Sequence, residues 1–573
     1  MSAVDNGELV FHIDIFILAA IGLFGAFALP RILGRLSCRE DLKNGFVFRS
    51  APQTEDGPRR SYDSQATEVP FGNVPTSQPG CGKAASPPRH VPEWTTYAHR
   101  LSVILRYPIA SKLSLGQALL LVAYFALLLY AEVYRASAFK HPIRAGFVAM
   151  SQIPLVYALA TKNNAIGILI GQGYEKLNFF HQWAGILLVL AANVHAIGYI
   201  YKFVYAGRWV KEAQTAYIRW GIVALVCLDI LLFFSTSIWR HKAYNIFFTS
   251  HAIALIVFLI AVPLHQKETI PYVAVAAGLY AGDLLLRAVK SRITTATLSR
   301  IPELGLTKLE IPHINAGWRA GQHVRLRILS RQMGWFGWTE MHPYTIAAAS
   351  GGPQGLVVLA KKSGRWSKNL YKMACSDSYE KGGLSGGQRV KVMIEGPYGG
   401  TGHCIPASFS GALMVGGGSG ITFPLAIVDD LLLRGAEGRS RVQTLHLVWV
   451  VQDSACLTPF IAFFAAFLAR STFNSFRVSI YYTGIRANLP EAPPDCTLPE
   501  GLTLTPARPD FASILDEIVD HTISTRSEGK IEKGGVLVGV CGPVALGQSV
   551  VRVVGKIDSK RRREVGGVEV HEE

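Results

Sequence analysis

Four histidines lie inside two apolar stretches of the sequence, in two pairs of equal spacing. His181 and His195 lie within "FFHQWAGILLVLAANVHAIGYI", and His251 and His265 lie within "HKAYNIFFTSHAIALIVFLIAVPLH". Imidazole rings are costly in hydrocarbon and usually have a function where they occur there. Each pair is separated by fourteen residues, which places both rings on one helix face, about 21 Å apart along the axis. Metal ligation is a chemistry that such rings supply.

The two helices that carry these histidines are separated by one other apolar stretch, so they are expected to run in the same direction. His181 would then oppose His251 at one depth, and His195 would oppose His265 at another. Two imidazoles that meet across a helix bundle are typical of bis-histidine haem ligation. A zinc ion would instead require ligands around one point. We therefore predict two b-type haems, the inner one bound by His181 and His251 and the outer one by His195 and His265.

Seven apolar stretches must position these histidines, and each is close to the roughly 20 residues that cross a bilayer. They cover residues 11–31, 113–134, 143–161, 177–203, 218–238, 243–265 and 270–289. The first stretch is followed by Arg31, Arg35 and Arg39, which by the positive-inside rule predicts that the amino terminus is outside. Seven crossings then place the rest of the chain in the cytosol.

The composition agrees with a membrane protein. The 573-residue chain carries a net charge of +17, and half of its residues are hydrophobic, which suggests membrane spans with basic flanks. The lysines and arginines are not interleaved with aromatic residues as in a nucleic-acid surface, so the lipid bilayer is the expected partner and nucleic acid is not. The eight cysteines are scattered without a C-x-x-C pair, which argues against a disulfide framework and a zinc site.

The remaining segments divide the chain into five parts. Residues 1–34 form the first membrane helix, and residues 35–110, rich in Ser, Pro, Gly and charge, are predicted to be a disordered cytosolic linker. Residues 111–290 hold the other six spans, the predicted di-haem core. Short β-branched stretches over 291–405 predict an antiparallel β-barrel, and alternating strand-like and helix-like stretches over 406–573 predict an α/β domain with a parallel sheet.

The stretch "MHPYTIAAAS" at residues 341–350 resembles the flavin-binding strand of ferredoxin-reductase-like barrels. By this resemblance, an aromatic side chain flanks the flavin ring and a hydroxyl binds it. Downstream, "KKSGRWSKNLY" predicts a helix start, where backbone N–H groups suit the pyrophosphate of FAD. The predicted FAD-binding residues are His342, Pro343, Tyr344, Thr345, Ile346, Gly364, Trp366 and Ser367.

A glycine-rich loop, "VGGGSGITFPL", follows a predicted strand and opens a predicted helix, which suits a dinucleotide phosphate. Its order after "EGPYGG" and before "CGP" resembles the nicotinamide half of the same reductases, and by this resemblance Cys541 is the catalytic residue beside the nicotinamide. Arg486 and Arg508 are predicted to bind the 2′-phosphate of NADPH, because the guanidinium fork pairs with phosphate. The predicted NADP-binding residues are Gly416, Gly417, Gly418, Ser419, Gly420, Ile421, Thr422, Arg486, Arg508, Cys541, Gly542 and Pro543.

Over roughly residues 110–573 the chain resembles the fungal-type ferric reductases, in the ferric reductase/NADPH oxidase family. The resemblance implies a plasma-membrane oxidoreductase that uses cytosolic NADPH, FAD and two b-type haems. It further implies Fe(III) or Cu(II) chelates outside the cell as acceptors, and an iron permease/oxidase uptake system as a partner. A superoxide-generating NADPH oxidase is the alternative, because only the outer acceptor differs. A non-catalytic membrane scaffold is a distant third.

Two departures from the family pattern concern the nucleotide site. Gln452 stands where many relatives carry Arg, and the chain ends in "GGVEVHEE" where relatives carry an aromatic residue that covers the flavin. We therefore expect either a truncated tail or a different nicotinamide gate. The predicted outer loop carries Lys202, Arg208, Lys211 and Arg219 against the single acid Glu212, and such a basic surface would attract anionic chelates.

Overall fold

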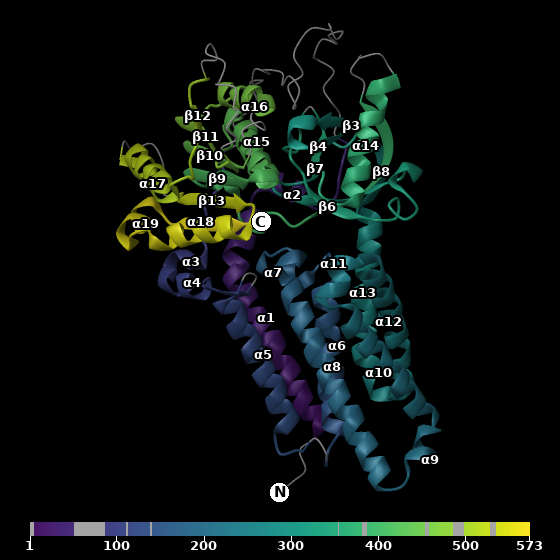
Figure 1. Ribbon diagram of the computed structural model, residues 1–573. Coiled ribbons are helices and arrows are strands. Elements are labelled where there is room, and N and C mark those ends of the chain that lie inside the picture. Colours follow the sequence, from purple (N-terminus) through teal and green to yellow (C-terminus); the bar gives the residue numbers. More distant parts are fainter. Residues whose placement is uncertain are drawn as a thin grey trace. The chain divides into compact units, whose positions relative to one another are not determined.

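The computed structural model describes residues 5–50, 86–110, 113–137, 140–352, 354–380, 387–452, 458–484, 498–527 and 534–573. The chain consists of two compact units, coloured along the sequence in Figure 1. The first unit comprises Met1–Phe27 and Ile104–Arg287, and the second comprises Ala28–Val103 and Ala288–Glu573.

The first unit is a helical bundle. Within the described ranges, seven helices are long and apolar enough to cross a membrane, which confirms the seven predicted spans. They are α1 (Asn6–Leu36), α5 (Leu115–Val133), α6 (Ile143–Ala160), α8 (Tyr174–Tyr205), α10 (Ala216–Phe234), α12 (Tyr244–His265) and α13 (Ile270–Lys290). Shorter elements join them: β1 (Pro108–Ala110), β2 (Leu113–Ser114), α7 (Ala165–Ile170), α9 (Trp209–Ala213), α11 (Ser237–Lys242) and η1 (Lys267–Thr269).

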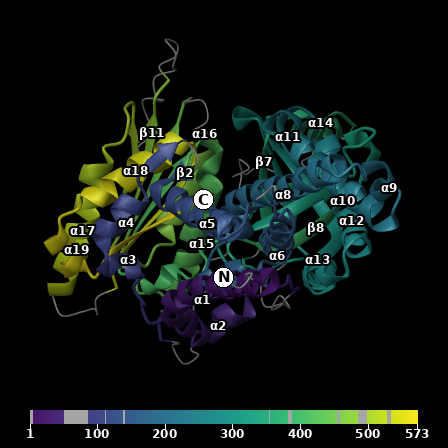
Figure 2. The ribbon, with the colours of Figure 1, turned by 90° about the horizontal axis from the view of Figure 1, so that it is seen from below.

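The histidine-bearing helices α8 and α12 each pack against α10, and the three helices lie side by side in two views (Figures 1 and 2). Their shared core contains small residues such as Ala224, Ala254 and Ala261 beside Leu188 and Phe258. Small side chains let membrane helices approach closely, where apolar burial alone provides little drive for association. The bundle is therefore able to bring side chains of α8 and α12 face to face.

The second unit contains an antiparallel barrel of six strands among the described residues. The strand order is β6-β5-β8-β3-β4-β7, and the Ile346–Val358 bridge brings the two ends of the sheet together. Trp318, Leu309 and Leu326 fill its core, and α14 (Arg365–Glu380) covers one side. The strands are β3 (Ser291–Ile301), β4 (Leu306–Ile311), β5 (His323–Ile328), β6 (His342–Thr345), β7 (Leu356–Lys361) and β8 (Gln388–Tyr398), with η2 (Pro302–Leu304) and η3 (Arg331–Met333) between them.

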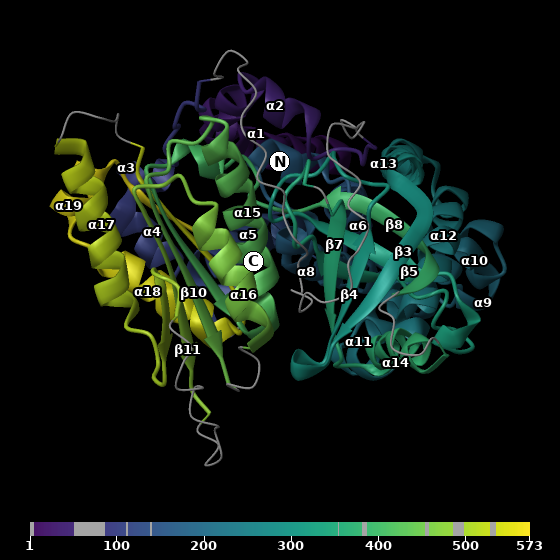
Figure 3. The same ribbon diagram turned by 90° about the horizontal axis from the view of Figure 1, so that it is seen from above.

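The same unit contains a parallel sheet in the order β12-β11-β10-β9-β13-β14, as the alternating pattern predicted. Alternate residues of β9 face opposite sides: Ala412 and Met414 pack toward α15 and α16, while Leu413 and Val415 pack toward α17 and α18 (Figure 3). The strands are β9 (Gly411–Gly417), β10 (Thr444–Val451), β11 (Ser475–Tyr482), β12 (Leu502–Thr505), β13 (Val536–Cys541) and β14 (Val568–Glu572). The helices are η4 (Pro406–Ser408), η5 (Gly418–Ile421), α15 (Thr422–Ala436), α16 (Thr458–Ala469), α17 (Phe511–Ser527), α18 (Val544–Lys556) and α19 (Ser559–Val565).

The prediction of a disordered linker over residues 35–110 is wrong for the residues that the structure describes there. Residues 28–50 and 86–103, which we call the strap, belong to the second unit. They include α2 (Arg39–Lys43), α3 (Trp94–Tyr97) and the first five residues of α4 (His99–Leu105). Phe48 is 3% exposed inside the barrel core, and Arg49 forms a β-bridge with Ala316. A few anchoring side chains produce no periodic pattern in the sequence. The prediction for residues 35–110 therefore depended on their polar composition, which is typical of disorder. Residues 51–85 lie outside the described part of the chain.

Candidate functional site

The four predicted histidines form two facing pairs in the helical bundle. The ring centroids of His181 and His251 are 6.5 Å apart, and those of His195 and His265 are 6.2 Å apart. The structure therefore brings together the pairs that the spacing predicted. No group of three or more His, Cys, Asp or Glu side chains that could hold a metal ion occurs in the described part of the chain, so each pair stands as two imidazoles.

Each histidine is fixed by a hydrogen bond at Nδ1. His181 donates to the carbonyl of Val156 over 3.0 Å and His195 donates to that of Pro142 over 2.9 Å. On the other helix, His265 donates to the carbonyl of Tyr217 over 2.7 Å, and the His251 Nδ1 lies 3.1 Å from the Ser235 hydroxyl. A partner at Nδ1 orients the ring and leaves Nε2 as the ligating atom, as at metal-bound histidines generally.

Two glycines on neighbouring helices make room for the outer pair. A Cβ at Gly146 would lie 2.7 Å from the His195 Nδ1, and a Cβ at Gly221 would lie 2.7 Å from the His265 Nδ1. One turn beyond His181, a Cβ at Gly185 would meet nothing within 4 Å. The sequence prediction missed these supports. A glycine inside an apolar helix is the signal that could have found Gly146 and Gly221, whereas a backbone carbonyl gives no sequence signal.

The separation of the rings fits a shared haem iron. An iron midway between His195 and His265 would lie 6.2/2, or 3.1 Å, from each ring centroid. This leaves about 2 Å for the bond to the near nitrogen, the usual length of a metal–imidazole bond. The donor set is also suitable, because two neutral imidazoles are the axial ligands of many b-type haems.

The predicted flavin strand is β6, at one end of the barrel sheet. Tyr344 stacks on Trp366 with ring centroids 6.0 Å apart, and His342 lies 4.4 Å from the same indole. Burial raises the pKa of the Tyr344 phenol, which keeps it protonated. The His342 Nε2 is also 3.0 Å from Glu340, which lies 3.4 Å from Arg365 at the start of α14. Pro343 is exposed, Thr345 is half-buried and Ile346 closes the barrel.

Helix α14 begins at Arg365, within the segment predicted to start a helix. Trp366 is 5% exposed, and its indole N–H donates to the Gly337 carbonyl, so it supports β6. The Ser367 hydroxyl accepts from the backbone N–H groups of Ser363 and Gly364, each over 3.0 Å, and so fixes the turn. A Cβ at Gly364 would meet nothing within 4 Å, which leaves open space at the helix start. The first-turn N–H groups of a helix have no intrahelical partner and suit a pyrophosphate placed there.

The glycine-rich loop joins β9 to α15 and packs against the predicted "CGP" segment. Gly416 pairs with Cys541 across β9 and β13, and a Cβ at Gly420 would lie 2.6 Å from the Cys541 carbonyl oxygen. Gly418 has φ +54°, in the left-handed region that favours glycine, and a Cβ there would meet nothing within 4 Å. One side of the loop is thus packed against Gly542 and Pro543. The other side, at Gly418 and the exposed Ser419, has free space beside the backbone. Ile421 and Thr422 are buried beneath it.

The structure places Cys541 at the carboxyl end of β13, beside the loop. Burial, together with the carboxylate of Glu573, raises the pKa of the Cys541 thiol to about 11, so the sulfur is a neutral thiol at physiological pH. His571, on the neighbouring strand, stacks on Phe423 of α15 with ring centroids 5.7 Å apart. A small neutral side chain at this edge leaves room for a flat ligand ring.

The two predicted phosphate-binding arginines have different outcomes. Arg486 lies outside the described residues. Arg508 is exposed and follows β12, three strands from β9 in the sheet order. Three strand spacings are about 14 Å, and the carboxyl ends of parallel strands share one edge. Arg508 is therefore on the edge that holds the glycine loop, at a distance suited to the far half of a dinucleotide.

Three family models match consecutive parts of the chain. The ferric reductase like transmembrane component matches residues 145–262, an FAD-binding domain matches residues 292–402, and the ferric reductase NAD binding domain matches residues 409–554. The first match includes His181, His195 and His251 and ends before His265. Among solved structures, the ferredoxin reductase in carbazole 1,9a-dioxygenase covers 50% of this chain with a TM-score of 0.30 and 14% sequence identity.

The relatives include ferric and ferric/cupric reductase transmembrane components of yeasts. Ferric/cupric reductase transmembrane component 7 of Saccharomyces cerevisiae is 29% identical over 333 residues, which are 54% of this chain and 49% of that protein. Ferric reductase transmembrane component 1 of Schizosaccharomyces pombe is 24% identical, over 55% of this chain and 60% of its own. The chain spans about half the length of the relatives it matches. With its transmembrane, FAD-binding and NAD-binding domains in this order, the chain is a homologue of the yeast ferric/cupric reductases.

Proposed function

We propose that the protein is a transmembrane metalloreductase that carries electrons from cytosolic NADPH, through FAD and two b-type haems, to Fe(III) or Cu(II) chelates outside the cell. The observation that carries the proposal is the pair of facing imidazoles at each of two levels of one bundle, His181 with His251 and His195 with His265. A flavin and nucleotide module follows the bundle in the same chain. FAD, when bound, converts the two-electron chemistry of the nucleotide into single electrons.

The proposal assigns a role to each group of residues. The loop from Gly416 to Thr422 binds the NADPH phosphates, and Cys541, Gly542 and Pro543 flank the nicotinamide. Arg508 binds the 2′-phosphate, β6 holds the flavin ring, and the N–H groups at the start of α14 bind the FAD pyrophosphate. The four histidines hold the two haems, and Pro142, Val156, Tyr217 and Ser235 hold the histidines.

Two haems are required by the width of the membrane. The hydrocarbon core is about 30 Å thick, and the fourteen-residue spacing divides this distance into shorter electron transfers. In the proposed orientation the amino terminus is outside and His195 and His265 bind the outer haem, in the plasma membrane. Transfer of an electron outward is then driven by about 2.3 kcal/mol per 100 mV of membrane potential.

The surface beside the outer pair supports a negatively charged acceptor. Tyr199 packs on His195 with ring centroids 5.0 Å apart, and the ammonium of Lys202 lies 5.9 Å from the Tyr199 ring. Lys211 is also exposed, whereas Arg208 forms an ion pair with Glu212 over 3.6 Å. Ferric citrate and similar chelates are anionic, so this surface would raise their local concentration. The reduced ion would pass to an iron permease/oxidase uptake system, the proposed partner.

Membranes that contain the protein provide the test. NADPH is supplied, and reduction of an Fe(III) chelate is followed together with superoxide formation, with and without superoxide dismutase. The proposal predicts chelate reduction that superoxide dismutase does not suppress and that is lost in His195→Ala. Chelate reduction that disappears with superoxide dismutase would instead identify a superoxide-generating oxidase. Purified protein without haem absorbance would exclude both functions and leave a membrane scaffold.

A further inference from the structure

Asp41, in the strap, is a buried carboxylate surrounded by arginines from three elements. It is 2% exposed. Its Oδ1 is 3.0 Å from Arg434 and its Oδ2 is 3.5 Å from Arg35. The backbone carbonyl of the same residue accepts two hydrogen bonds from Arg319, over 3.2 and 2.8 Å. Asp41 therefore joins parts of the chain that are hundreds of residues apart in sequence, such as Arg434, 393 residues away.

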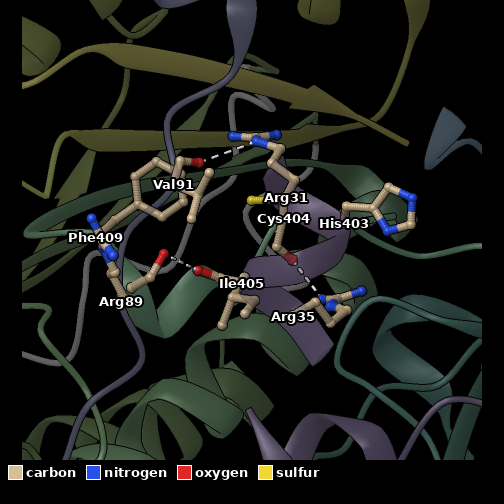
Figure 4. Close-up of a pocket in the computed structure, with 10 residues that line it drawn as sticks. Arg31, Arg35, Arg89, Val91, His403, Cys404, Ile405 and Phe409 are labelled. Atoms are coloured by element: carbon tan, nitrogen blue, oxygen red, sulfur yellow. Dashed lines mark hydrogen bonds between the residues drawn. The ribbon is translucent and has the colours of Figure 1, made fainter. Parts of the chain in front are cut away.

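The three arginines belong to the strap itself, to the barrel and to the parallel-sheet domain. Arg35 is in the last turn of α1, where it also donates to the carbonyl of Cys404 (Figure 4). Arg319 lies in the loop before β5 of the barrel, next to Trp318 of the barrel core. Arg434 is in the last turn of α15 and also pairs with Asp430 over 2.8 Å. Asp41 is thus in contact with the barrel and with the helix that follows the glycine loop.

The charges of this group, which we call the Asp41 cluster, depend on one another. It contains the arginines Arg35, Arg319 and Arg434 and the acids Asp41 and Asp430. Burial alone would raise the pKa of the Asp41 carboxyl, but Arg434 and Arg35 outweigh burial and hold it below its usual value. Burial and then the charge of Arg35 lower the pKa of Arg319 to about 10. Loss of the Asp41 charge would leave one buried and two partly buried guanidinium groups against one carboxylate, and like charges at such distances repel.

The cluster lies where the barrel and the parallel-sheet domain meet. The Ala349 N–H, after β6, donates to the Asp429 carboxylate of α15 over 2.9 Å. A Cβ at Gly321 of the barrel would lie 2.6 Å from the Phe423 ring of the same helix. Helix α15 begins at the glycine loop, and β6 is the proposed flavin strand. The contacts between α15 and the barrel would therefore set the distance between the nicotinamide and the flavin.

We propose that Asp41 is a positioning residue for hydride transfer: through Arg319 and Arg434 it holds α15 against the barrel and so fixes the nicotinamide relative to the flavin. The inference rests on the proposed function. The step moves one hydride, so the reduced nicotinamide is oxidised by two electrons and the flavin is reduced by two. Such a step requires reacting atoms about 3–3.5 Å apart, and a misplacement of 1 Å costs roughly 100-fold in rate.

The test compares Asp41→Asn with Glu569→Gln in the full-length protein. Glu569 is also a buried carboxylate that anchors the strap, through Arg31 and the Glu93 N–H, but it belongs to β14 of the parallel-sheet domain, and these partners lie in the strap and not in the barrel. Flavin reduction by NADPH is followed by stopped flow over a range of NADPH concentrations. We expect Asp41→Asn to lower the limiting rate about 10- to 100-fold with less than a twofold change in the NADPH Kd, while Glu569→Gln stays close to wild type.

Further measurements separate positioning from simple loss of structure. FAD content and the extent of flavin reduction by dithionite should be unchanged in Asp41→Asn. If Asp41→Asn does not retain FAD, Arg434→Lys is the variant to test. A single ammonium cannot reach both Asp41 and Asp430 as the guanidinium fork does, so the limiting rate of flavin reduction should also fall in Arg434→Lys. A wild-type limiting rate in the variant that retains FAD, or equal losses in Asp41→Asn and Glu569→Gln, would overturn the inference. Absence of NADPH-driven flavin reduction in the wild-type protein would instead overturn the proposed function.

Discussion

The close approach of Gly146 to His195 predicts that a single methyl group will weaken binding of the haem proposed for His195 and His265. In Gly146→Ala the new Cβ would lie 2.7 Å from Nδ1 and 2.8 Å from Cε1 of the His195 ring. The ring cannot turn aside freely, because its Nδ1 donates to the Pro142 carbonyl over 2.9 Å. Ordinary contact needs about 3.5 Å, so the ring or the helix must move by roughly 0.8 Å. Overpacking of this kind costs about 1–3 kcal/mol, which is about a 5- to 150-fold loss of haem affinity.

Haem content measures this effect directly. Purified Gly146→Ala should contain about half the haem of the wild-type protein, with the inner pair, His181 and His251, still occupied. Gly221→Ala, which brings a Cβ equally close to His265, should behave in the same way. Gly278→Ala is the matched control, because a Cβ on this exposed face of α13 would meet nothing within 4 Å. Full haem content in Gly146→Ala, with an unshifted spectrum and wild-type chelate reduction, would refute the reasoning.

Three further predictions concern charge. Lys202→Gln with Lys211→Gln should raise the KM for anionic Fe(III) chelates and flatten its salt dependence at unchanged haem content, because steering by exposed charges is screened by salt; an unchanged KM would contradict steering. Arg508→Ala should raise the KM for NADPH about threefold to tenfold and leave that for NADH unchanged; equal effects on both nucleotides would contradict 2′-phosphate binding. His446 is buried, which lowers its pKa from 6.5 to about 4. The folded state therefore favours the neutral ring, so stability is full above pH 6.5 and should fall by up to about 3 kcal/mol as the pH drops to 4; Tm should decline over this range in the wild type and less in His446→Gln.

The membrane half could be predicted in most detail from the sequence. Apolar length and the equal spacing of His181–His195 and His251–His265 are local properties, and the bundle forms the pairs they indicated. The groups that hold the rings could not be predicted in the same way. The carbonyls of Val156, Pro142 and Tyr217 are backbone atoms, which any residue type could provide.

In the second unit, motifs predicted contacts within each domain but not the contacts that join them. The motifs assigned the glycine loop and Cys541 to one nucleotide site, and the structure pairs Gly416 with Cys541 across β9 and β13. Trp366 lies at the predicted helix start, but the motif did not predict that its buried ring contacts His342 and Tyr344 of β6. The strap escaped prediction because Asp41 and the short apolar run Phe46–Phe48 are too brief to show a periodic pattern, and their partners are set only by tertiary structure.

The strap also has a consequence for biosynthesis. Asp41 is translated 393 residues before Arg434, which at roughly 5–20 residues per second is a delay of about 20–80 s. During that interval six further apolar helices are synthesised, and the barrel and the parallel-sheet domain can close only after the segment joins them. Expression of residues 288–573 alone would omit an integral piece of those domains, exposing the part of the barrel core that Phe48 covers. Residues 28–50 and 86–103 should therefore be kept with residues 288–573 in any attempt to fold the second unit alone.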